Sequence, residues 1–201
     1  MNMNMKKLFY VLLTIGTFGI LPGLAQNTFS VQYSMGFGSG DVKSYISSSS
    51  LSGALVSYRY MTSPKLGAGV DVGWNGFYER RAYDTYTSGT VSLSGTQYRY
   101  IDAVPIYLAA DYHFKPDEKM CPYVGLGVGT LLTKRRTDMG LYTLKTDTWA
   151  FALRPEIGVL LNANPDMDII LAAKYNIGFA TSDLASQAYF TFNMGFVFKG
   201  H

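Results

Sequence analysis

The feature that most constrains this chain is its last apolar stretch, residues 187–198, in which large apolar residues occupy alternate positions. Because successive side chains of a β-strand point to opposite faces, Phe190, Phe192, Met194, Phe196 and Phe198 share one face. The other face carries small or polar residues and one glycine. A strand in a soluble sandwich turns its apolar face into the core, whereas this second face suits a crowded, polar lumen. The stretch therefore indicates a strand with lipid on one side and a filled barrel interior on the other.

Seven earlier segments show the same alternation of apolar with small or polar residues. Each is at least as long as the ~9–11 residues that a tilted strand needs to cross a bilayer. The eight predicted strands are residues 29–37, 53–61, 66–75, 101–114, 122–132, 149–161, 169–179 and 187–198. After residue 25 no stretch has the ~20 apolar residues that a spanning helix requires.

The connections between these segments alternate in length. Residues 62–65, 115–119 and 162–166 are short turns rich in Pro, Asn and Asp. Residues 39–51, 79–97 and 134–147 are long and polar, and residues 181–186 form a shorter link. Transmembrane barrels have short periplasmic turns and longer external loops, so we predict that the long segments are external loops.

The first 25 residues are typical of an export signal. Lys6 and Lys7 precede an apolar stretch that is too short for a spanning helix, and residues 23–25 supply the small residues read by a signal peptidase. We therefore predict a signal peptide at residues 1–25, cleavage before Gln26, and one barrel domain at residues 26–201. A retained N-terminal anchor is the alternative, which Pro22 disfavours.

The composition of the mature chain limits its partners. Removing 25 of the 201 residues leaves 176, with 15 Lys+Arg because two of the 17 lie in the signal, against 14 Asp+Glu. A charge of +1 gives no reason to expect nucleic acid as a partner. Only 15% of residues are charged, against about 25% in soluble domains, which indicates a surface that does not face water everywhere. Cys121 is the only cysteine, so closed backbone pairing, and not a disulfide, must hold the fold together.

These observations predict an all-β fold, an eight-stranded, antiparallel, closed transmembrane barrel in the outer membrane of a Gram-negative bacterium. Aromatic residues near the strand ends favour two girdles at the membrane interfaces over ordinary strand-end packing. The residues assigned to the girdles are Tyr58, Tyr60, Trp74, Phe77, Tyr78, Tyr112, Phe114, Trp149, Phe151, Tyr175 and Phe179.

Two stretches resemble the small outer-membrane β-barrel family that includes OmpA-type, OmpX-type and opacity-type domains. One is the glycine-rich alternating run at residues 122–129, and the other is the terminal Gly195-Phe196-Val197-Phe198. The resemblance spans the mature chain and implies that the terminal strand, with Gly195, Phe196 and Phe198, is the signal read by the barrel-assembly machinery. Members of the family often end on an aromatic residue, and this chain departs from that pattern by continuing to His201. The resemblance specifies architecture better than function.

The charged residues on the lumen faces are the one candidate functional site that the sequence offers. They are Arg59, Asp71, Asp111, Arg154, Glu156 and Lys174. Counting from the short turns places Arg59 near Asp71, Glu156 opposite or diagonal to Lys174, and Asp111 opposite Tyr123. A barrel of eight strands is just wide enough to be filled by its own side chains, so these charges must pair. The favoured interpretation is a plug that sets packing and register, and the alternative is a gated, narrow path for protons or small ions.

The sequence offers little for catalysis. Its two histidines are His113, on an inward face near a short turn, and His201, the last residue. Some small barrels resemble lipid A deacylases with a lipid-facing Ser/His pair, but His113 has no such neighbour. Two scattered histidines and one cysteine do not predict a metal site, and the glycines of residues 125–129 lack the Lys-Ser/Thr of a phosphate loop. We therefore predict no enzyme, no metal and no cofactor.

The function predicted is a structural or surface-interaction role, with a lumen largely plugged by charged and polar side chains. The alternative is a porin-like narrow channel for ions or small solutes, and a lipid-modifying enzyme is the least favoured class. The basic runs at residues 79–81 and 134–136 either contact lipopolysaccharide phosphates or lie solvated at loop bases. The expected partners are outer-membrane lipids and lipopolysaccharide, the assembly machinery during insertion, and an external ligand of the loops.

Overall fold

The computed structural model describes residues 27–88, 91–116, 118–140, 142–182 and 184–200, leaving aside the side chains of residues 86–93. The predicted signal peptide, its cleavage site and His201 lie outside the described residues. Among those described, no helix is long and apolar enough to cross a membrane.

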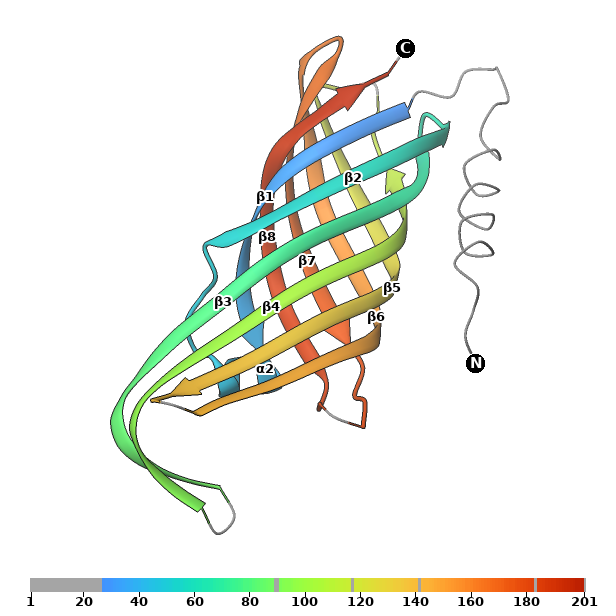
Figure 1. The fold of residues 1–201 in the computed structure, drawn as a ribbon. Helices are drawn as coiled ribbons and strands as arrows, with labels where there is room; N and C mark the ends of the chain where they lie inside the picture. The colour runs from blue at the N-terminus through green and yellow to red at the C-terminus, as the bar shows by residue number, and fades with distance from the viewer. Residues whose placement is uncertain (1–26, 89–90, 117, 141, 183, 201) are drawn as a thin grey trace, which may run out of the picture.

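Eight strands form a closed antiparallel barrel in which each strand pairs with its sequence neighbours, as Figure 1 shows. The strands are β1 (Asn27–Ser39), β2 (Ser52–Ser63), β3 (Leu66–Ser88), β4 (Val91–His113), β5 (Met120–Met139), β6 (Tyr142–Asn164), β7 (Met167–Gly178) and β8 (Gln187–Lys199). The ring closes where β1 pairs with β8, from Thr28 with Lys199 to Ser39 with Ala188. This closure confirms the predicted fold class, and every predicted strand lies within or largely within one observed strand.

The four middle strands are longer than predicted. Residues 79–97 and 134–147, which we expected to be polar loops, are mostly strand, because β3 pairs with β4 as far as Ser88–Val91 and β5 pairs with β6 as far as Met139–Tyr142. A strand that rises out of the membrane has water on both faces, so it carries polar residues at every position and loses the alternation that marks a buried face. The loop prediction was wrong for this reason. We call this the hairpin end of the barrel, and the opposite end, which has the tight turns, the short-turn end.

The first long connection is also partly ordered. Residues 39–51 contain the short helix α2 (Gly40–Tyr45), which lies at the hairpin end between β1 and β2 in the sequence (Figure 1). Gly40 has φ +53°, a left-handed backbone conformation that favours glycine and lets the chain turn from β1 into the helix. Val42 of α2 is buried, so the helix is packed against the barrel rather than extended into solvent.

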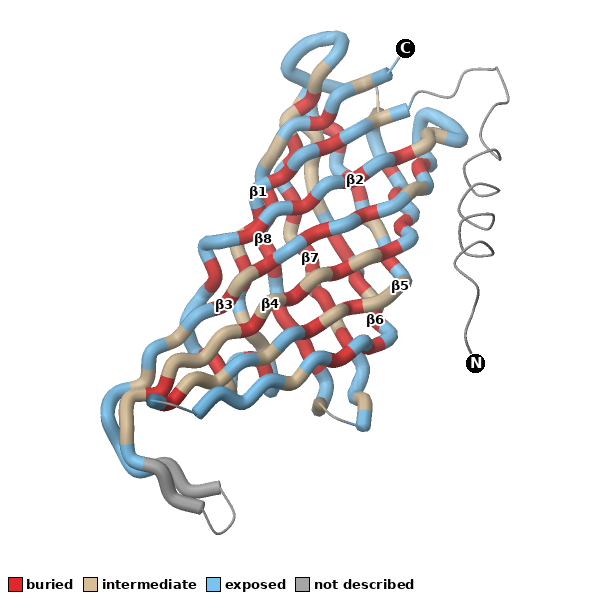
Figure 2. The backbone as a smooth tube through the Cα atoms, in the orientation of Figure 1, coloured by how far each residue is buried: buried red, intermediate tan, exposed pale blue. Residues whose placement is uncertain are grey.

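The barrel has an inverted polarity in its central part. Buried and exposed positions alternate along each strand, as the bands in Figure 2 show. Large apolar residues such as Val72, Leu126 and Phe192 are exposed on the outside, whereas Gln32 and Asp71 are buried inside. Such an apolar outer surface is suited to lipid.

Candidate functional site: the lumen

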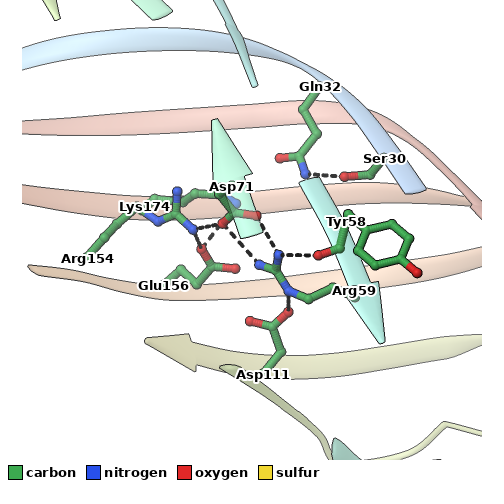
Figure 3. A network of polar contacts seen from close by, with 9 residues as sticks. All are labelled: Ser30, Gln32, Tyr58, Arg59, Asp71, Asp111, Arg154, Glu156 and Lys174. Atoms are coloured by element: carbon green, nitrogen blue, oxygen red, sulfur yellow. Dashed lines mark hydrogen bonds and ion pairs between the residues drawn. The ribbon is translucent and has the colours of Figure 1, made fainter. Parts of the chain in front are cut away.

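The six predicted lumen charges meet inside the barrel. Arg59 on β2 connects two carboxylates, since its Nη1 lies 2.5 Å from Asp71 Oδ1 on β3 and its Nε donates to Asp111 on β4. Arg154 on β6 donates to the second oxygen of Asp71 and lies 2.9 Å from Glu156 Oε2. Figure 3 shows these side chains converging from facing walls.

The chain of contacts ends at Lys174 on β7, whose Nζ lies 3.1 Å from Glu156 Oε2. The network therefore has three cations and three carboxylates, and all six residues are buried. A buried ion is tolerated when it is paired and hydrogen-bonded, because desolvation otherwise costs several kcal/mol. The arrangement is neutral as a whole, so its six members depend on one another.

Two of the three pairings deduced by counting residues are confirmed. Glu156 lies directly opposite Lys174 in the register of β6 and β7, and Arg59 contacts Asp71 diagonally across β2 and β3. The third was wrong, since Asp111 lies opposite Gly125 and Tyr123 lies opposite His113. The backbone bond from Phe114 N to Pro122 O moves the centre of the turn by one residue, which shifts every partner on β5 by two.

The position opposite Asp111 explains part of the glycine-rich run. A Cβ added at Gly125 would lie 2.5 Å from Asp111 Oδ1 and 2.8 Å from Glu156 Cγ. A side chain there would displace both carboxylates, so glycine gives the space in which the charges cross the narrow lumen.

A cavity of about 150 Å³ lies on the short-turn side of the network and reaches Arg59, Asp111 and Lys174. His113 and Tyr123 stack in its wall with ring centroids 5.4 Å apart, and His113 Nδ1 lies 3.6 Å from Cys121 Sγ. The buried Tyr123 Oη has no protein hydrogen-bond partner, which suits a hydrated space. His113 faces this interior, so it does not form a lipid-facing Ser/His pair.

The lumen toward the hairpin end contains an apolar cluster, which the sequence analysis did not anticipate. A buried cluster gathers residues from around the barrel and from α2, with members Val42, Ile46, Phe77, Ile101, Ala103, Tyr107, Leu131, Ala152 and Tyr189. Phe77, which we assigned to an outer girdle, points inward with its ring centroid 5.6 Å from that of Tyr189. Inward apolar residues such as Ile101 and Leu131 were the available signal, but alternation alone does not show that a loop helix returns to cover them.

Known proteins resemble this chain in structure but not in sequence. No family model and no curated protein matches the sequence. Solved structures do match, among them Neisserial surface protein A, with 16% identity, a TM-score of 0.54, and coverage of 88% of this chain and 97% of that one. The outer membrane protein OprG from Pseudomonas aeruginosa has 14% identity and a TM-score of 0.55, covering 88% and 96%. Ail, the attachment invasion locus protein of Yersinia pestis, has 13% identity and a TM-score of 0.51, covering 88% and 97%.

This chain has the fold of the small outer-membrane β-barrels. At these identities the likeness concerns the fold alone. It agrees with the resemblance noted in the sequence and with the apolar outer surface.

In an outer-membrane barrel the last strand presents one face to lipid, and the two aromatic residues of the predicted assembly signal lie on that face. Phe196 and Phe198 are exposed on the outside of β8. Gly195 lies opposite Gln32 of β1, where an added Cβ would come 2.1 Å from the carbonyl oxygen of Val31. The residues after Phe198 are tied to the barrel, because Lys199 Nζ lies 2.8 Å from Asp168 Oδ1. Their role in assembly stays a prediction.

The two basic runs of the barrel are divided between its faces. In the run at residues 134–136, Lys134 and Arg136 are exposed, whereas Arg135 is half-buried and donates to Gln187 Oε1. In the run at residues 79–81, Arg80 is exposed, whereas Arg81 contacts Glu79 at 3.1 Å. Alternation along the strands therefore leaves only part of each run available to a lipid phosphate.

Glu79 holds the connection between α2 and β2 at the hairpin end. It accepts hydrogen bonds from the backbone N–H of Ser47, from Ser47 Oγ at 2.8 Å and from the N–H of Ser48 at 3.2 Å. Burial raises the pKa of Glu79, but these hydrogen bonds and the charge of Arg81 lower it by more, so the pKa lies below its ordinary value. Glu79 is therefore a charged anchor for residues 47–48.

Proposed function

We propose that this chain is an outer-membrane protein with a surface-interaction role, carried by the sheet that rises from the barrel at its hairpin end. The pairing of β6 with β7 begins at Ala152–Gly178, although β6 itself begins at Tyr142. Phe151 still accepts a bond from Phe179. Among the described residues, no strand pairs with the other edge of residues 142–150.

This edge supports the proposal because a free strand edge is a template for pairing with an extended segment of another protein. Tyr142 and Leu144 are 63% and 72% exposed on it, although both are apolar enough to contribute to a contact. A surface role requires this edge to lie outside the cell, and the alternation of turn lengths favours an external position for the hairpins. Partners of the loops, and contact between lipopolysaccharide and Lys134 or Arg136, remain part of this proposal.

The lumen supports a structural contribution in addition to the surface role. The ion-pair network crosses the barrel, and the apolar cluster lies between it and the hairpin end. We propose that together they plug the lumen, so that the barrel strengthens the envelope without conducting. No reaction is assigned to the barrel.

An adhesion assay tests the surface role. Cells that lack the protein are complemented with the wild type, with the double variant Tyr142→Lys/Leu144→Lys, or with Tyr83→Lys as a matched control on the neighbouring hairpin. The edge variant should restore the barrier to dye uptake but lose most adhesion to a protein-coated surface, because charge on an edge blocks strand addition. The control variant should restore both. Full adhesion by the edge variant would overturn the surface role.

The second candidate, a narrow path for ions or small solutes, is favoured by one observation. The cavity of about 150 Å³ extends from the short-turn end to Arg59 and Lys174. A continuous path would therefore require an opening only between these residues and the hairpin end. Planar-bilayer recordings distinguish the two candidates. The plugged barrel should give no discrete conductance steps, whereas steps that change with Lys174→Ala would favour the channel.

A further inference from the structure

The apolar cluster inside the hairpin end forms a bowl whose wall belongs to the barrel. We define the bowl by Phe77, Ile101, Leu131, Ala152 and Tyr189, which come from β3, β4, β5, β6 and β8 and are almost completely buried. An apolar bowl beneath the mouth suits an apolar body that enters from the hairpin end.

Arginines surround the mouth of this bowl. The guanidinium carbons of Arg99 and Arg135 lie 4.9 and 4.8 Å from the centre of the Tyr45 ring. Arg99 Nη1 donates to the Tyr45 carbonyl oxygen at 3.0 Å, and Arg81 Nη2 donates to the Ser44 carbonyl oxygen at 3.3 Å. These positive charges at the mouth would favour an occupant with electronegative atoms. Glu79 is paired with Arg81 on the same rim.

Helix α2 occupies the bowl in the manner of an internal ligand. Val42 of the helix and Ile46, the residue that follows it, are buried in the apolar cluster, and Arg99 and Arg135 both contact the Tyr45 ring. Carbonyl oxygens of the same segment accept hydrogen bonds from Arg81 and Arg99 on the rim. The helix thus presents an apolar body together with an electronegative head.

Besides the arginine contacts, polar contacts hold the helix and the residues after it to the mouth. Tyr45 Oη donates to the carbonyl oxygen of Arg136 at 3.2 Å, and Glu79 binds the N–H groups of Ser47 and Ser48. The segment is bounded by two isolated backbone bridges, Gly40 with Gln187 and Gly36 with Ser50. Residues 41–49 between these bridges are therefore the part that would have to leave for the bowl to open.

We propose that the bowl and its arginine rim form a binding site for a small amphiphile with an anionic head and a short aliphatic tail, and that α2 is its built-in competitor. The tail replaces Val42 and Ile46, which corresponds to a chain of about eight carbons, the size of a medium-chain carboxylate. The carboxylate replaces the carbonyl oxygens at Arg81 and Arg99 and gains charge-assisted hydrogen bonds. Because α2 must leave first, the observed affinity is the intrinsic affinity reduced by the fraction of open molecules.

Methyl NMR of the barrel in nanodiscs tests this site with octanoate as the probe. The resonances of Ile101 and Leu131 report on the bowl, and Leu171, which faces outward, reports on partition into lipid. The variant Val42→Ser/Ile46→Ser weakens the internal competitor and leaves the arginine rim unchanged, whereas Glu79→Gln loosens the anchor and also releases Arg81 from its carboxylate partner. Saturable shifts of Ile101 and Leu131 should appear at octanoate concentrations at least about tenfold lower in either variant than in the wild type.

Two controls separate a built site from apolar partition. Octanol, which has the same tail without the charge, should bind at least about tenfold more weakly than octanoate. Adding Arg81→Gln and Arg99→Gln to the Glu79→Gln variant should remove that preference, because these two arginines are the proposed partners of the carboxylate. The proposal is overturned if Leu171 shifts as strongly as Ile101, if octanol binds as well as octanoate, or if a folded Glu79→Gln variant has the wild-type affinity.

Discussion

Removing Glu156 should destabilise the barrel more than removing Lys174, because the ion-pair network is asymmetric. Glu156 Oε2 lies 2.9 Å from Arg154 Nη2 and 3.1 Å from Lys174 Nζ, whereas no other carboxylate within 4 Å of Lys174 Nζ is described. Glu156→Ala therefore leaves an unpaired buried ammonium, with an expected cost of about 3–5 kcal/mol in the free energy of unfolding. Lys174→Ala leaves Glu156 still bound to Arg154, so its cost should be about 1–3 kcal/mol.

The double variant completes the test. With both side chains removed the network regains neutrality, so Glu156→Ala/Lys174→Ala should cost less than the sum of the single variants, by about 1–3 kcal/mol. Urea titration of the barrel in lipid vesicles, followed by tryptophan fluorescence, measures each free energy of unfolding. Thr191→Val is the matched control, because Thr191 is a buried, uncharged lumen residue opposite Lys174. Strict additivity of the single variants would refute the pairing, and an equal cost for Glu156→Ala and Thr191→Val would show that charge is not the cause.

Three further predictions follow from other parts of the chain. Phe198→Asp should impair insertion and leave aggregated or degraded protein, whereas Thr191→Asp should be milder because it points into a polar lumen; equal membrane yields would mean that the faces are wrongly assigned. Because the pKa of Glu79 is depressed, its stabilisation of residues 47–48 is present above the unfolded pKa of about 4.3 and is lost as the pH falls through the folded value. The protection of the Ser47 and Ser48 amides, measured as exchange relative to the intrinsic rate at each pH, should therefore fall at acid pH and be low at all pH values in Glu79→Gln. N-terminal sequencing of membrane-inserted protein should find Gln26 or its cyclised form, and an intact Met1 would exclude cleavage.

The fold could be predicted because a strand has a period of two residues, and in a membrane barrel the face toward lipid must be apolar while the face toward the lumen is small or polar. In β8, five large apolar residues alternate with small or polar ones, which specifies strand, outer face and lumen face together. The same rule found all six network residues, because a charge on a lumen face within a membrane-spanning segment must find a partner. Pairing between adjacent strands followed wherever the turn was counted correctly, as for Glu156 and Lys174.

The rest of the structure depends on information that alternation does not contain. Outside the lipid both strand faces meet water, so the outer parts of β3 to β6 had the composition of loops. The register of Asp111 depended on the placement of a single turn residue. Val42 and Ile46 belong to one buried cluster with residues from five strands, and no local pattern in residues 39–51 specifies where that segment returns.

The proposed plug consists of two layers in series with different physical origins. The central layer is a network of three cations and three carboxylates, whereas the outer layer is the apolar cluster that includes Val42 of α2, the helix we propose to be displaceable. Displacing α2 would expose the bowl but leave the ion pairs across the lumen, so ligand binding at the mouth does not require a conducting pore. Conversely, breaking the network at Glu156 would connect the short-turn cavity only as far as the apolar cluster. Binding outside and conduction through the barrel are therefore separable properties, and a variant that changes one without the other would show which layer it affects.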